Sequence, residues 1–333
     1  MNKLLANLIC CFIPKKKNRK HFRNKYLNKT KMVKNNLLSK HLLFDKDSNY
    51  LYTNNKYLDK KIKNFKKIGI TEEKRKNELI VSLTSFPERM KDIKYTIYSL
   101  LNQTIKPNKI ILWLADSQFP NKEKDLSDEI LNFKNNGLSI EWCDDLKSYK
   151  KLIPALLKYP NAVVVTADDD IYYRENWLEL LYNSYLKNHN MVHCHRGHLI
   201  KKDNNSNDID INYSNWSKCI ENVEPSFLNF ATGCGGILYP PNSLYKDVIN
   251  VKLFQKLTPT ADDIWFWAMA VLNNTKINIV KNNQKDMIYT NLDRELCRNN
   301  DLTLAKINNN QNKNMEQLNN VLEHYKELKI MKR

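Results

Sequence analysis

The chain has 333 residues, of which 42% are hydrophobic and 27% charged, and its formal net charge is +18. This composition supports a buried core in one large domain, or in one domain plus an extension. Residues 1–76 hold 22 Lys and Arg against 5 Asp and Glu, whereas residues 77–333 have a net charge of only +1, so the basic charge belongs to an N-terminal arm. The seven cysteines are scattered without a CxxC pair, which argues against a disulfide framework and favours a reducing compartment.

Residues 1–26 combine an apolar stretch with a basic one. Residues 4–13 are mostly apolar, well short of the ~20 residues that a spanning helix needs, and seven Lys or Arg follow between positions 15 and 25. A signal peptide has the reverse order. We expect this segment to lie on an anionic membrane surface, at the inner face of the cytoplasmic membrane. The alternative is a solvated or nucleic-acid-binding basic arm.

The predicted elements follow in chain order. Residues 27–76 are polar and predict a linker or short helices, residues 77–305 form the main domain, and residues 306–333 form a helical tail. Strands are predicted at 78–86, 108–116, 138–144, 162–170, 191–198 and 276–280, and helices at 88–104, 148–160, 175–188 and 258–274. Because strands and helices alternate and the first strands are continuous apolar runs, the pattern predicts an α/β fold. Its sheet should be mostly parallel and covered on both faces.

Three consecutive aspartates, Asp168, Asp169 and Asp170, follow the fourth predicted strand. In an open α/β sheet, ligands bind beyond the carboxyl ends of the strands. Strand alternation predicts that Asp168 and Asp170 share one side and that Asp169 points elsewhere. Such oxygen ligands suit Mg²⁺ or Mn²⁺ together with a diphosphate. The alternative is a solvated turn that caps the helix starting near Glu175.

From about residue 78 to residue 275 the chain resembles a GT-A fold glycosyltransferase of the family-2-like kind, which uses nucleotide-sugar donors. "SLLNQT" (99–104) is similar to the end of that family's first helix, and "TADDD" (166–170) resembles its DxD motif. A "KKLIPAL" helix before "TADDDIYY" is similar to bacterial surface-polysaccharide transferases. The order and spacing of these motifs carry the resemblance, and the apolar-then-basic N-terminus is similar too.

The resemblance implies roles for individual residues of the donor site. Asp170 would bind the metal, and Asp168 would contact the ribose, or the metal through water, while Asp169 supports the geometry. The nucleotide would face Thr84, Ser85 and Arg89, and Lys150 or Lys151 would reach the diphosphate, with a solvated helix face as the alternative for the two lysines. Where the family often has a "DDGS"-like element, this chain has "LADSQF" with the single Asp116, which leaves recognition of the base open.

The acceptor half contains a second acidic pair, Asp262 and Asp263, in "TADDIWFW". An inverting sugar transfer needs a base for the acceptor hydroxyl, and the resemblance implies that the second acid, Asp263, is that base. The alternative is structural, because Thr260 and Asp263 have the spacing of a helix capping box, and in that case Asp262 or neither acid would be catalytic.

Three further residues are candidates for acceptor contacts. Trp265 could stack on a sugar, although its spacing to Met269 and Leu272 is helical and predicts a core position. Gly235 and Gly236 could let the backbone approach a sugar, or form a plain turn.

The stretch "HCHRGH" raises the possibility of zinc through His193, Cys194, His195 and His198. No second cluster with ligand spacing occurs, so a structural zinc site is disfavoured. Contact of Arg196 or a histidine with the donor or acceptor is the preferred interpretation.

Taken together, the sequence predicts a glycosyltransferase that uses Mg²⁺ or Mn²⁺. It would move a sugar from a nucleotide-diphosphate donor to a glycan or lipid-linked acceptor in surface polysaccharide or lipopolysaccharide synthesis. A nucleotidyltransferase is one alternative, but such enzymes normally have a Gly-rich loop after the first strand, and "SLTSFPERM" has no glycine. A nucleic-acid-binding protein is the other, and the net charge of +1 in residues 77–333 argues against it.

Overall fold

A computed structural model describes residues 40–45, 50–202, 208–221, 223–296 and 312–328. The predicted membrane-surface segment, residues 1–26, lies outside this described part. None of the described helices combines the length and apolar character needed to cross a membrane.

The centre of the described part is a seven-stranded sheet in the order β11-β7-β10-β6-β3-β4-β5. Its strands are β3 (Leu79–Thr84), β4 (Lys109–Ala115), β5 (Leu138–Cys143), β6 (Val163–Ala167), β7 (Val192–Cys194), β10 (Ile237–Tyr239) and β11 (Ile277–Ile279). All of them run in the same direction except β10, which pairs antiparallel with both β6 and β7. The predicted α/β class with a mostly parallel sheet is therefore confirmed.

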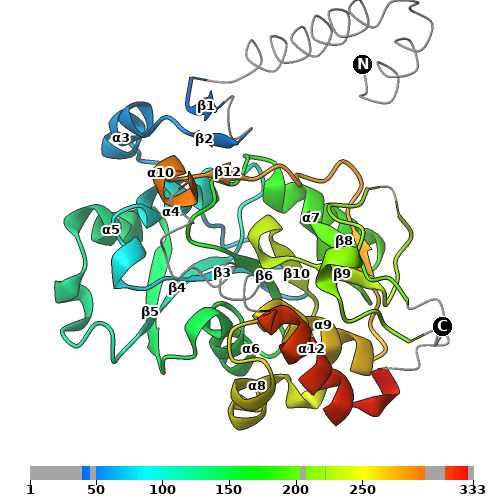
Figure 1. Cartoon of the computed structure of the whole chain (residues 1–333). Helices are drawn as coiled ribbons and strands as arrows, with labels where there is room; N and C mark the ends of the chain where they lie inside the picture. The colour runs from blue at the N-terminus through cyan, green and yellow to red at the C-terminus, as the bar shows by residue number, and fades with distance from the viewer. Residues whose placement is uncertain (1–39, 46–49, 203–207, 222, 297–311, 329–333) are drawn as a thin grey trace, which may run out of the picture.

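Helices cover both faces of this sheet (Figure 1). One face packs against α3 (Asn55–Lys63), α4 (Ile93–Leu101), α5 (Asp128–Asn132) and α7 (Trp177–Lys187), and the other against α6 (Ile153–Lys158), α8 (Val251–Leu257), α9 (Asp262–Leu272) and α12 (Lys313–His324). Successive residues of one strand enter different cores, as with Ile80 and Val81 in β3. Because both faces are buried, the strands are apolar without interruption.

A smaller three-stranded sheet joins the N-terminal segment to the C-terminal part. It consists of β1 (Leu42–Phe44), β2 (Leu51–Thr53) and β12 (Ile288–Tyr289), which is followed by α10 (Leu292–Leu296). The Thr53 hydroxyl donates to the Thr290 carbonyl, and the Thr290 N–H donates to the Asp170 carbonyl at 3.0 Å. The sequence pattern does not predict these strands, because two or three residues are too few to show a period.

The second half of the domain departs from the predicted elements. The predicted strand 191–198 is two strands, β7 and β8 (Gly197–Leu199), and β8 pairs with β9 (Asn229–Ala231) in a separate two-stranded sheet. The glycine-rich stretch that follows contains the turn η6 (Gly233–Gly235) and leads into β10, in the middle of the main sheet. The chain thus leaves the main sheet after Cys194 and returns to it at Ile237.

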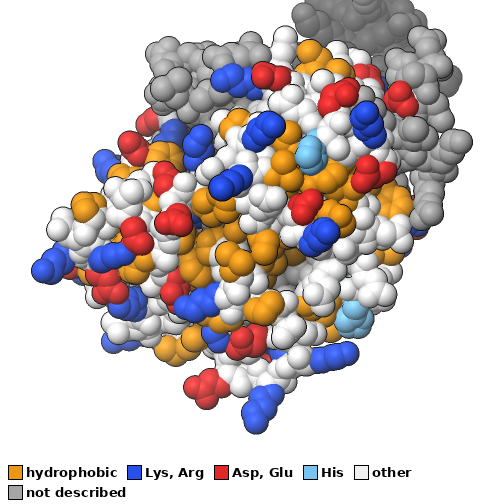
Figure 2. Space-filling model, turned by 90° about the horizontal axis from the view of Figure 1, so that it is seen from below, with side chains coloured by type: hydrophobic (Ala, Val, Ile, Leu, Met, Phe, Trp, Pro, Cys, Tyr) orange, Lys and Arg blue, Asp and Glu red, His pale blue; other side chains and the backbone are white. Residues whose placement is uncertain are grey.

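Charges of both signs are interspersed on the face that carries α6, α8 and α12 (Figure 2). Hydrophobic side chains gather in the middle of this view, and the large hydrophobic residues with exposed side chains include Leu157 of α6 and Ile249, just before α8. No single sign of charge dominates the face, in line with the net charge of +1 for residues 77–333.

Candidate active site

The candidate site lies beyond the carboxyl ends of β3 and β6, in the middle of the main sheet. β3 pairs in parallel with β4 on one side and with β6 on the other. The chain order therefore reverses beside β3, and such a reversal opens the crevice in which α/β sheets bind their ligands. Ser85 follows β3, and Asp168 follows β6, so both predicted groups meet at this crevice.

Two of the three consecutive aspartates share one guanidinium group. Arg89 Nη1 lies 2.6 Å from Asp169 Oδ1 and 2.6 Å from Asp170 Oδ2, and Ser85 Oγ donates to Asp169 Oδ2 at 2.5 Å. Burial lowers the pKa of Arg89, but the charges of Asp170 and Asp169 outweigh this and raise the pKa above its ordinary value. Arg89 thus stays positively charged between the two aspartates, whereas burial raises the pKa of Asp169 above its ordinary value.

The predicted grouping of Asp168 with Asp170 is wrong. Strand β6 ends at Ala167, so the alternation of a strand does not extend to the aspartates. The turn directs Asp169 and Asp170 to Arg89, and Asp168 turns the other way, to Lys151. Asp169 is buried and bonded, which fits its predicted supporting part in the geometry.

Lys151 joins carboxylates from the two halves of the domain. Its Nζ lies 2.9 Å from Asp168 Oδ1 and 3.0 Å from Asp262 Oδ2, although the angle to Asp262 is not that of a hydrogen bond. Burial lowers the pKa of Lys151, but Asp168, Asp262 and Asp263 outweigh it and raise the pKa well above its usual value. Lys151 is therefore a fixed positive charge.

Lys150 points away from this group. It forms an ion pair with Asp145 at 2.8 Å and a longer contact of 3.4 Å with Gln118. Both lysines are buried, so the alternative of a solvated helix face is wrong for each. The structure separates the two candidates, because the 3₁₀ turn η4 (Lys147–Lys151) directs adjacent side chains to different partners.

Asp263 lies half-buried at the start of α9. The N–H of Gly233 donates to both of its carboxylate oxygens, at 3.1 and 3.2 Å. Burial, and next the charge of Asp262, raise the pKa of Asp263 to about 7, against 3.8 for an ordinary Asp. A carboxyl group with this pKa can accept and release a proton near neutral pH.

The capping-box interpretation of Asp263 is wrong. The residue before α9 is Ala261, and no side chain caps the helix there. Thr260 instead exchanges hydrogen bonds with Gln317 of α12. The carboxylate of Asp263 is directed to the Gly233 backbone rather than back to Thr260.

Gly233 is a site residue that the sequence interpretation missed. A Cβ at this position would lie 2.7 Å from Lys151 Nζ and 3.0 Å from Asp263 Oδ1. Glycine is thus what allows the backbone to approach both charged groups. The only signal in the sequence is the glycine-rich "TGCGG" itself, which does not say which glycine matters.

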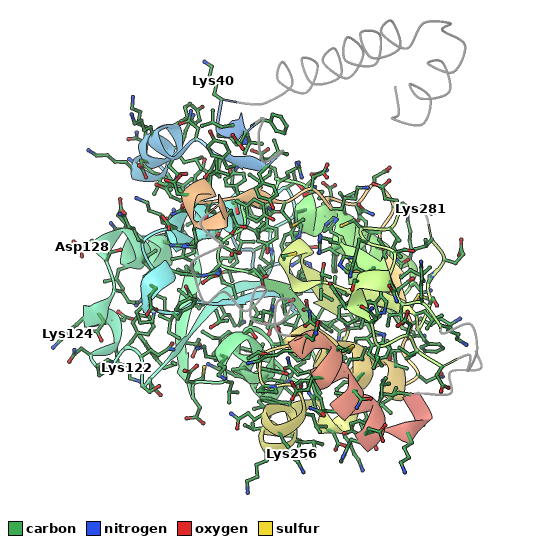
Figure 3. All side chains as sticks on the ribbon, viewed as in Figure 1. Lys40, Lys122, Lys124, Asp128, Lys256 and Lys281 are labelled. Carbon is green, nitrogen blue, oxygen red and sulfur yellow. The ribbon has the colours of Figure 1, made fainter. Side chains whose placement is uncertain are left out.

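Two predicted donor residues lie near the same edge of the sheet but outside the charged group. Thr84 Oγ1 donates to the Trp113 carbonyl at 2.8 Å. Asp116 follows β4, is half-exposed and forms an ion pair with Lys122. Figure 3 shows Lys122 at the periphery of the domain, in the same part as Lys124 and Asp128. A role of Asp116 in recognising a base stays a prediction.

The predicted acceptor residues are structural. Trp265 is 0% exposed and donates from Nε1 to the Val248 carbonyl, so it offers no face to a sugar. A Cβ on Gly235 would lie 2.6 Å from Arg196 Cβ, and one on Gly236, which has a φ of +88°, would lie 2.3 Å from the Trp177 ring. These glycines serve internal packing, which corrects the acceptor assignment of all three residues.

The three histidines of "HCHRGH" are bonded within the protein. His193 contacts the Ser184 hydroxyl and the Asn188 carbonyl, His195 contacts the Trp177 carbonyl and the Gln284 N–H, and His198 accepts from the Cys219 N–H. Burial lowers the pKa of each to about 4, so they are neutral. No group of three His, Cys, Asp or Glu side chains is arranged to hold a metal ion in the described part of the chain.

We call five carboxylates and the two cations that hold them the acidic cluster: Asp168, Asp169, Asp170, Asp262 and Asp263 with Lys151 and Arg89. Negative groups outnumber positive ones in it. Lys151 contacts one oxygen of Asp168 and Arg89 one oxygen of Asp170, while the two aspartate side chains stay 28% and 17% exposed. The cluster therefore fits a divalent cation held by one or two carboxylates, with water and substrate phosphate as its other ligands.

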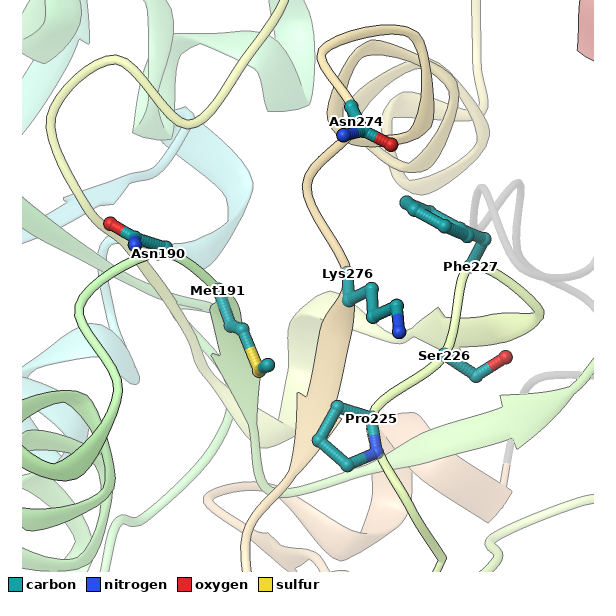
Figure 4. Close-up of a pocket in the computed structure, with 7 residues that line it drawn as sticks. All are labelled: Asn190, Met191, Pro225, Ser226, Phe227, Asn274 and Lys276. Atoms are coloured by element: carbon teal, nitrogen blue, oxygen red, sulfur yellow. The ribbon is translucent and has the colours of Figure 1, made fainter. Parts of the chain in front are cut away.

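A cavity of about 500 Å³ lies away from this cluster (Figure 4). It is lined by Asn190, Met191, Pro225, Ser226, Phe227, Asn274 and Lys276. Met191 and Lys276 directly precede β7 and β11, so the cavity opens at the amino ends of the strands, opposite to the edge where the acidic cluster lies.

No protein-family model matches the chain, and no curated protein matches it. Among solved structures, it is similar to Staphylococcus aureus TarS 1–349, with 15% identity over 74% of this chain and 72% of that chain and a TM-score of 0.40. It is similar to a CMP:2-keto-3-deoxy-manno-octonic acid synthetase complexed with CTP, with 12% identity over 61% of this chain and 88% of that chain and a TM-score of 0.38. It is also similar to the inositol-1-phosphate CTP transferase from T. maritima, with 11% identity over 75% and 98% of the two chains and a TM-score of 0.38. Similarities of this size assign no family, substrate or reaction to the chain.

Proposed function

We propose that this chain is a metal-dependent glycosyltransferase of the GT-A type. It would move a sugar from a nucleotide-diphosphate donor to a hydroxyl group of a glycan or lipid-linked acceptor. The observation that carries the proposal is the convergence on Lys151, at the reversal point of the sheet, of Asp168 and of the pair Asp262 and Asp263 about ninety residues later. Asp170 supplies a partly exposed carboxylate for a cation, and Asp263 supplies an acid with a pKa of about 7.

In the proposed reaction Asp263 is the base. It takes the proton of the acceptor hydroxyl as that oxygen attacks the anomeric carbon. The bond between this carbon and the donor's diphosphate breaks, so the nucleoside diphosphate leaves with the bonding electrons and the configuration inverts. The Gly233 N–H steadies the carboxylate of Asp263, and the charge of Lys151 keeps its pKa from rising further.

Asp170 would hold Mn²⁺ or Mg²⁺ in this proposal, and Asp168, which is directed to Lys151, would contact the ribose, or the metal through water. A bound divalent cation neutralises the charge that grows on a departing diphosphate. Arg89 holds Asp169 and Asp170 in place, and Ser85 adds a further bond to Asp169. Ser85 and Arg89 would thus contribute to the donor site by positioning carboxylates, in addition to the nucleotide contact that the resemblance implies.

The first experiment is a thermal-shift screen of nucleotide sugars with and without Mn²⁺, followed by analysis of the products. A glycosyltransferase releases the nucleoside diphosphate and forms a glycoside. A nucleotidyltransferase, for which the same carboxylates could hold the cation, would instead release pyrophosphate from a nucleoside triphosphate. Metal-dependent pyrophosphate release, without use of any nucleotide sugar, would replace our proposal with this alternative.

We also propose that residues 1–26 hold the enzyme on the anionic inner surface of the cytoplasmic membrane, where lipid-linked acceptors for surface polysaccharides lie. The support is their apolar-then-basic order. Full-length protein should sediment with vesicles that contain anionic lipid, and a variant that lacks residues 1–26 should stay in the supernatant. Equal sedimentation of the two would contradict the attachment.

A further inference from the structure

Two cations close to Asp263 have no acidic partner in the described part of the chain. Arg196 lies between β7 and β8, and its Nη1 donates to the Thr232 hydroxyl at 2.8 Å. Lys218 lies over the Tyr213 ring, with Nζ 3.0 Å from the ring centre, and donates to the Tyr213 carbonyl. No Asp or Glu among the described residues forms an ion pair with either. We call Arg196 and Lys218 the basic pair.

The two charges lie on adjacent segments, because the Cys219 N–H donates to His198 Nδ1 at 3.0 Å and the Ile220 N–H donates to the Gly197 carbonyl at 3.1 Å. Burial, and next the charge of Arg196, lower the pKa of Lys218 to about 8. Burial, Arg196 and Lys218 together lower the pKa of His198 to about 4. Cations placed together without a counter-charge repel each other, and the partial burial of Arg196 adds to the cost. A guanidinium has five N–H donors, of which the contact to Thr232 uses one.

The basic pair borders the proposed base. Thr232 accepts from Arg196, and the next residue, Gly233, donates to Asp263. Burial raises the pKa of Tyr213. The charge of Asp263 raises this pKa further, and the charge of Arg196 lowers it, so Tyr213 lies close enough to interact with both charges. Residues 232–233 therefore contact the basic pair through Thr232 and the acidic cluster through Gly233.

We propose that Arg196 and Lys218 bind a phosphate group carried by the acceptor. This inference rests on the proposed function and names its acceptor class. A phosphate has up to two negative charges, which two cations match, and a guanidinium is well shaped for its oxygens. The donor's diphosphate belongs with Asp168 and Asp170, where a cation would neutralise it. In an inverting transfer the acceptor oxygen attacks from the face opposite the leaving diphosphate, and the base contacts that oxygen. A charge-binding site on the far side of the base from the diphosphate would therefore meet the acceptor.

Binding of inorganic phosphate tests the inference without any assay of transfer. We would follow phosphate by ³¹P line broadening, with Mg²⁺ present and sodium acetate as the control for ionic strength. Lys218→Gln should weaken binding by about tenfold, and Arg196→Gln by at least as much, because hydrogen bonds to charged groups are lost. Lys285→Gln is the matched control, since Lys285 already pairs with Glu221 at 2.6 Å. Because Lys218 is exposed, Lys218→Gln should fold and still test the inference if Arg196→Gln does not fold.

Competition separates the acceptor's phosphate from the donor's. Phosphate bound by the basic pair should remain when UDP, CDP or GDP is added with Mg²⁺. Displacement by a nucleoside diphosphate would assign the pair to the donor and overturn the inference, as would unchanged binding in both variants, or acetate acting as well as phosphate. If no nucleotide binds at all, the donor part of the proposed function fails, while a phosphate site that depends on Lys218 still stands.

Discussion

The acidic cluster and the basic pair lie on either side of residues 232–233 and differ in how far the protein itself neutralises them. In the acidic cluster, Lys151 and Arg89 each contact two carboxylates, so both cations already have acidic partners. In the basic pair, Arg196 and Lys218 have only a hydroxyl, a carbonyl and two aromatic rings as close partners among the described residues. One region has spare negative charge and the other spare positive charge.

This difference indicates what each region lacks. Buried or half-buried charge is costly without a partner. The acidic cluster has an excess of negative charge, and the basic pair has an excess of positive charge. A divalent cation would balance the acidic cluster and an anionic group would balance the basic pair. Asp263 lies where the two regions meet, and its burial between them keeps its pKa near neutrality.

Asp263→Asn should abolish most of the turnover. Loss of a general base costs about 10²–10⁴-fold in rate, whereas binding of the nucleotide-sugar donor should persist, because Asn keeps the shape of the side chain. The measurement is turnover together with donor affinity. Asp128→Asn is the control, since Asp128 lies at the periphery of the domain (Figure 3). A rate within tenfold of the wild type would place the base elsewhere.

Asp170→Ala should remove the dependence on a divalent cation. We expect a loss of about 10²-fold or more in metal-supported turnover, because the cation stabilises several kcal/mol of developing charge. Titration with Mn²⁺, before and after EDTA, measures this effect. Wild-type turnover that EDTA leaves unchanged would contradict a metal role for the acidic cluster.

Arg89→Gln should destabilise the fold itself. It leaves two carboxylates, Asp169 and Asp170, without their shared cation, and breaking a buried ion pair costs about 3–5 kcal/mol. The free energy of unfolding in urea measures the loss. Lys122→Gln breaks the exposed pair with Asp116 and should cost no more than about 1 kcal/mol. Equal costs for the two variants would show that the acidic cluster does not depend on Arg89.

The ionisation of Asp263 should make stability depend on pH. Its pKa is raised to about 7 in the folded protein, so the folded state keeps a proton that the unfolded chain has already released. This contribution is complete below the ordinary Asp pKa of 3.8 and is lost as pH rises through about 7. Relative to Asp263→Asn, the wild type should lose about 1 kcal/mol of stability between pH 6 and pH 8.

Thermal unfolding of both proteins at several pH values measures this effect. Parallel curves over that range would mean that Asp263 is ionised throughout. The acid limb of the turnover profile should fall in the same range, because the base acts only when it has lost its proton.

Most strands of the first half could be predicted because they are long and apolar. β3, β4, β5 and β6 each have at least five residues and lie within the predicted ranges. β7 to β11 have three residues each, which is too short to show the two-residue alternation of a strand. Nothing in the sequence near β10 indicates that it runs antiparallel to its neighbours. The break of the strand predicted at 191–198 into β7 and β8 has the same cause.

The candidate site was predictable in residue type but not in pairing. Acidic residues directly after a buried strand and at the start of a helix identify Asp168 to Asp170 and the pair Asp262 and Asp263. Their partners come from elsewhere in the chain, and no spacing rule connects Lys151 to Asp262 or Arg89 to Asp169. Trp265 is of a residue type that often stacks on sugars, yet it is 0% exposed, because its helix packs it into the core.

The sequence alone determined the class of sheet and the acidic groups at its carboxyl edge, because apolar runs and the residues that follow them are local properties of the chain. The three-dimensional fold was needed to find which carboxylates share Lys151, how Gly233 meets Asp263, and that Arg196 and Lys218 lie on adjacent segments without an acidic partner among the described residues. These contacts join segments that are far apart in the chain, and burial sets their energies. A local sequence pattern contains neither the distance between two such segments in the folded protein nor the loss of water that burial brings.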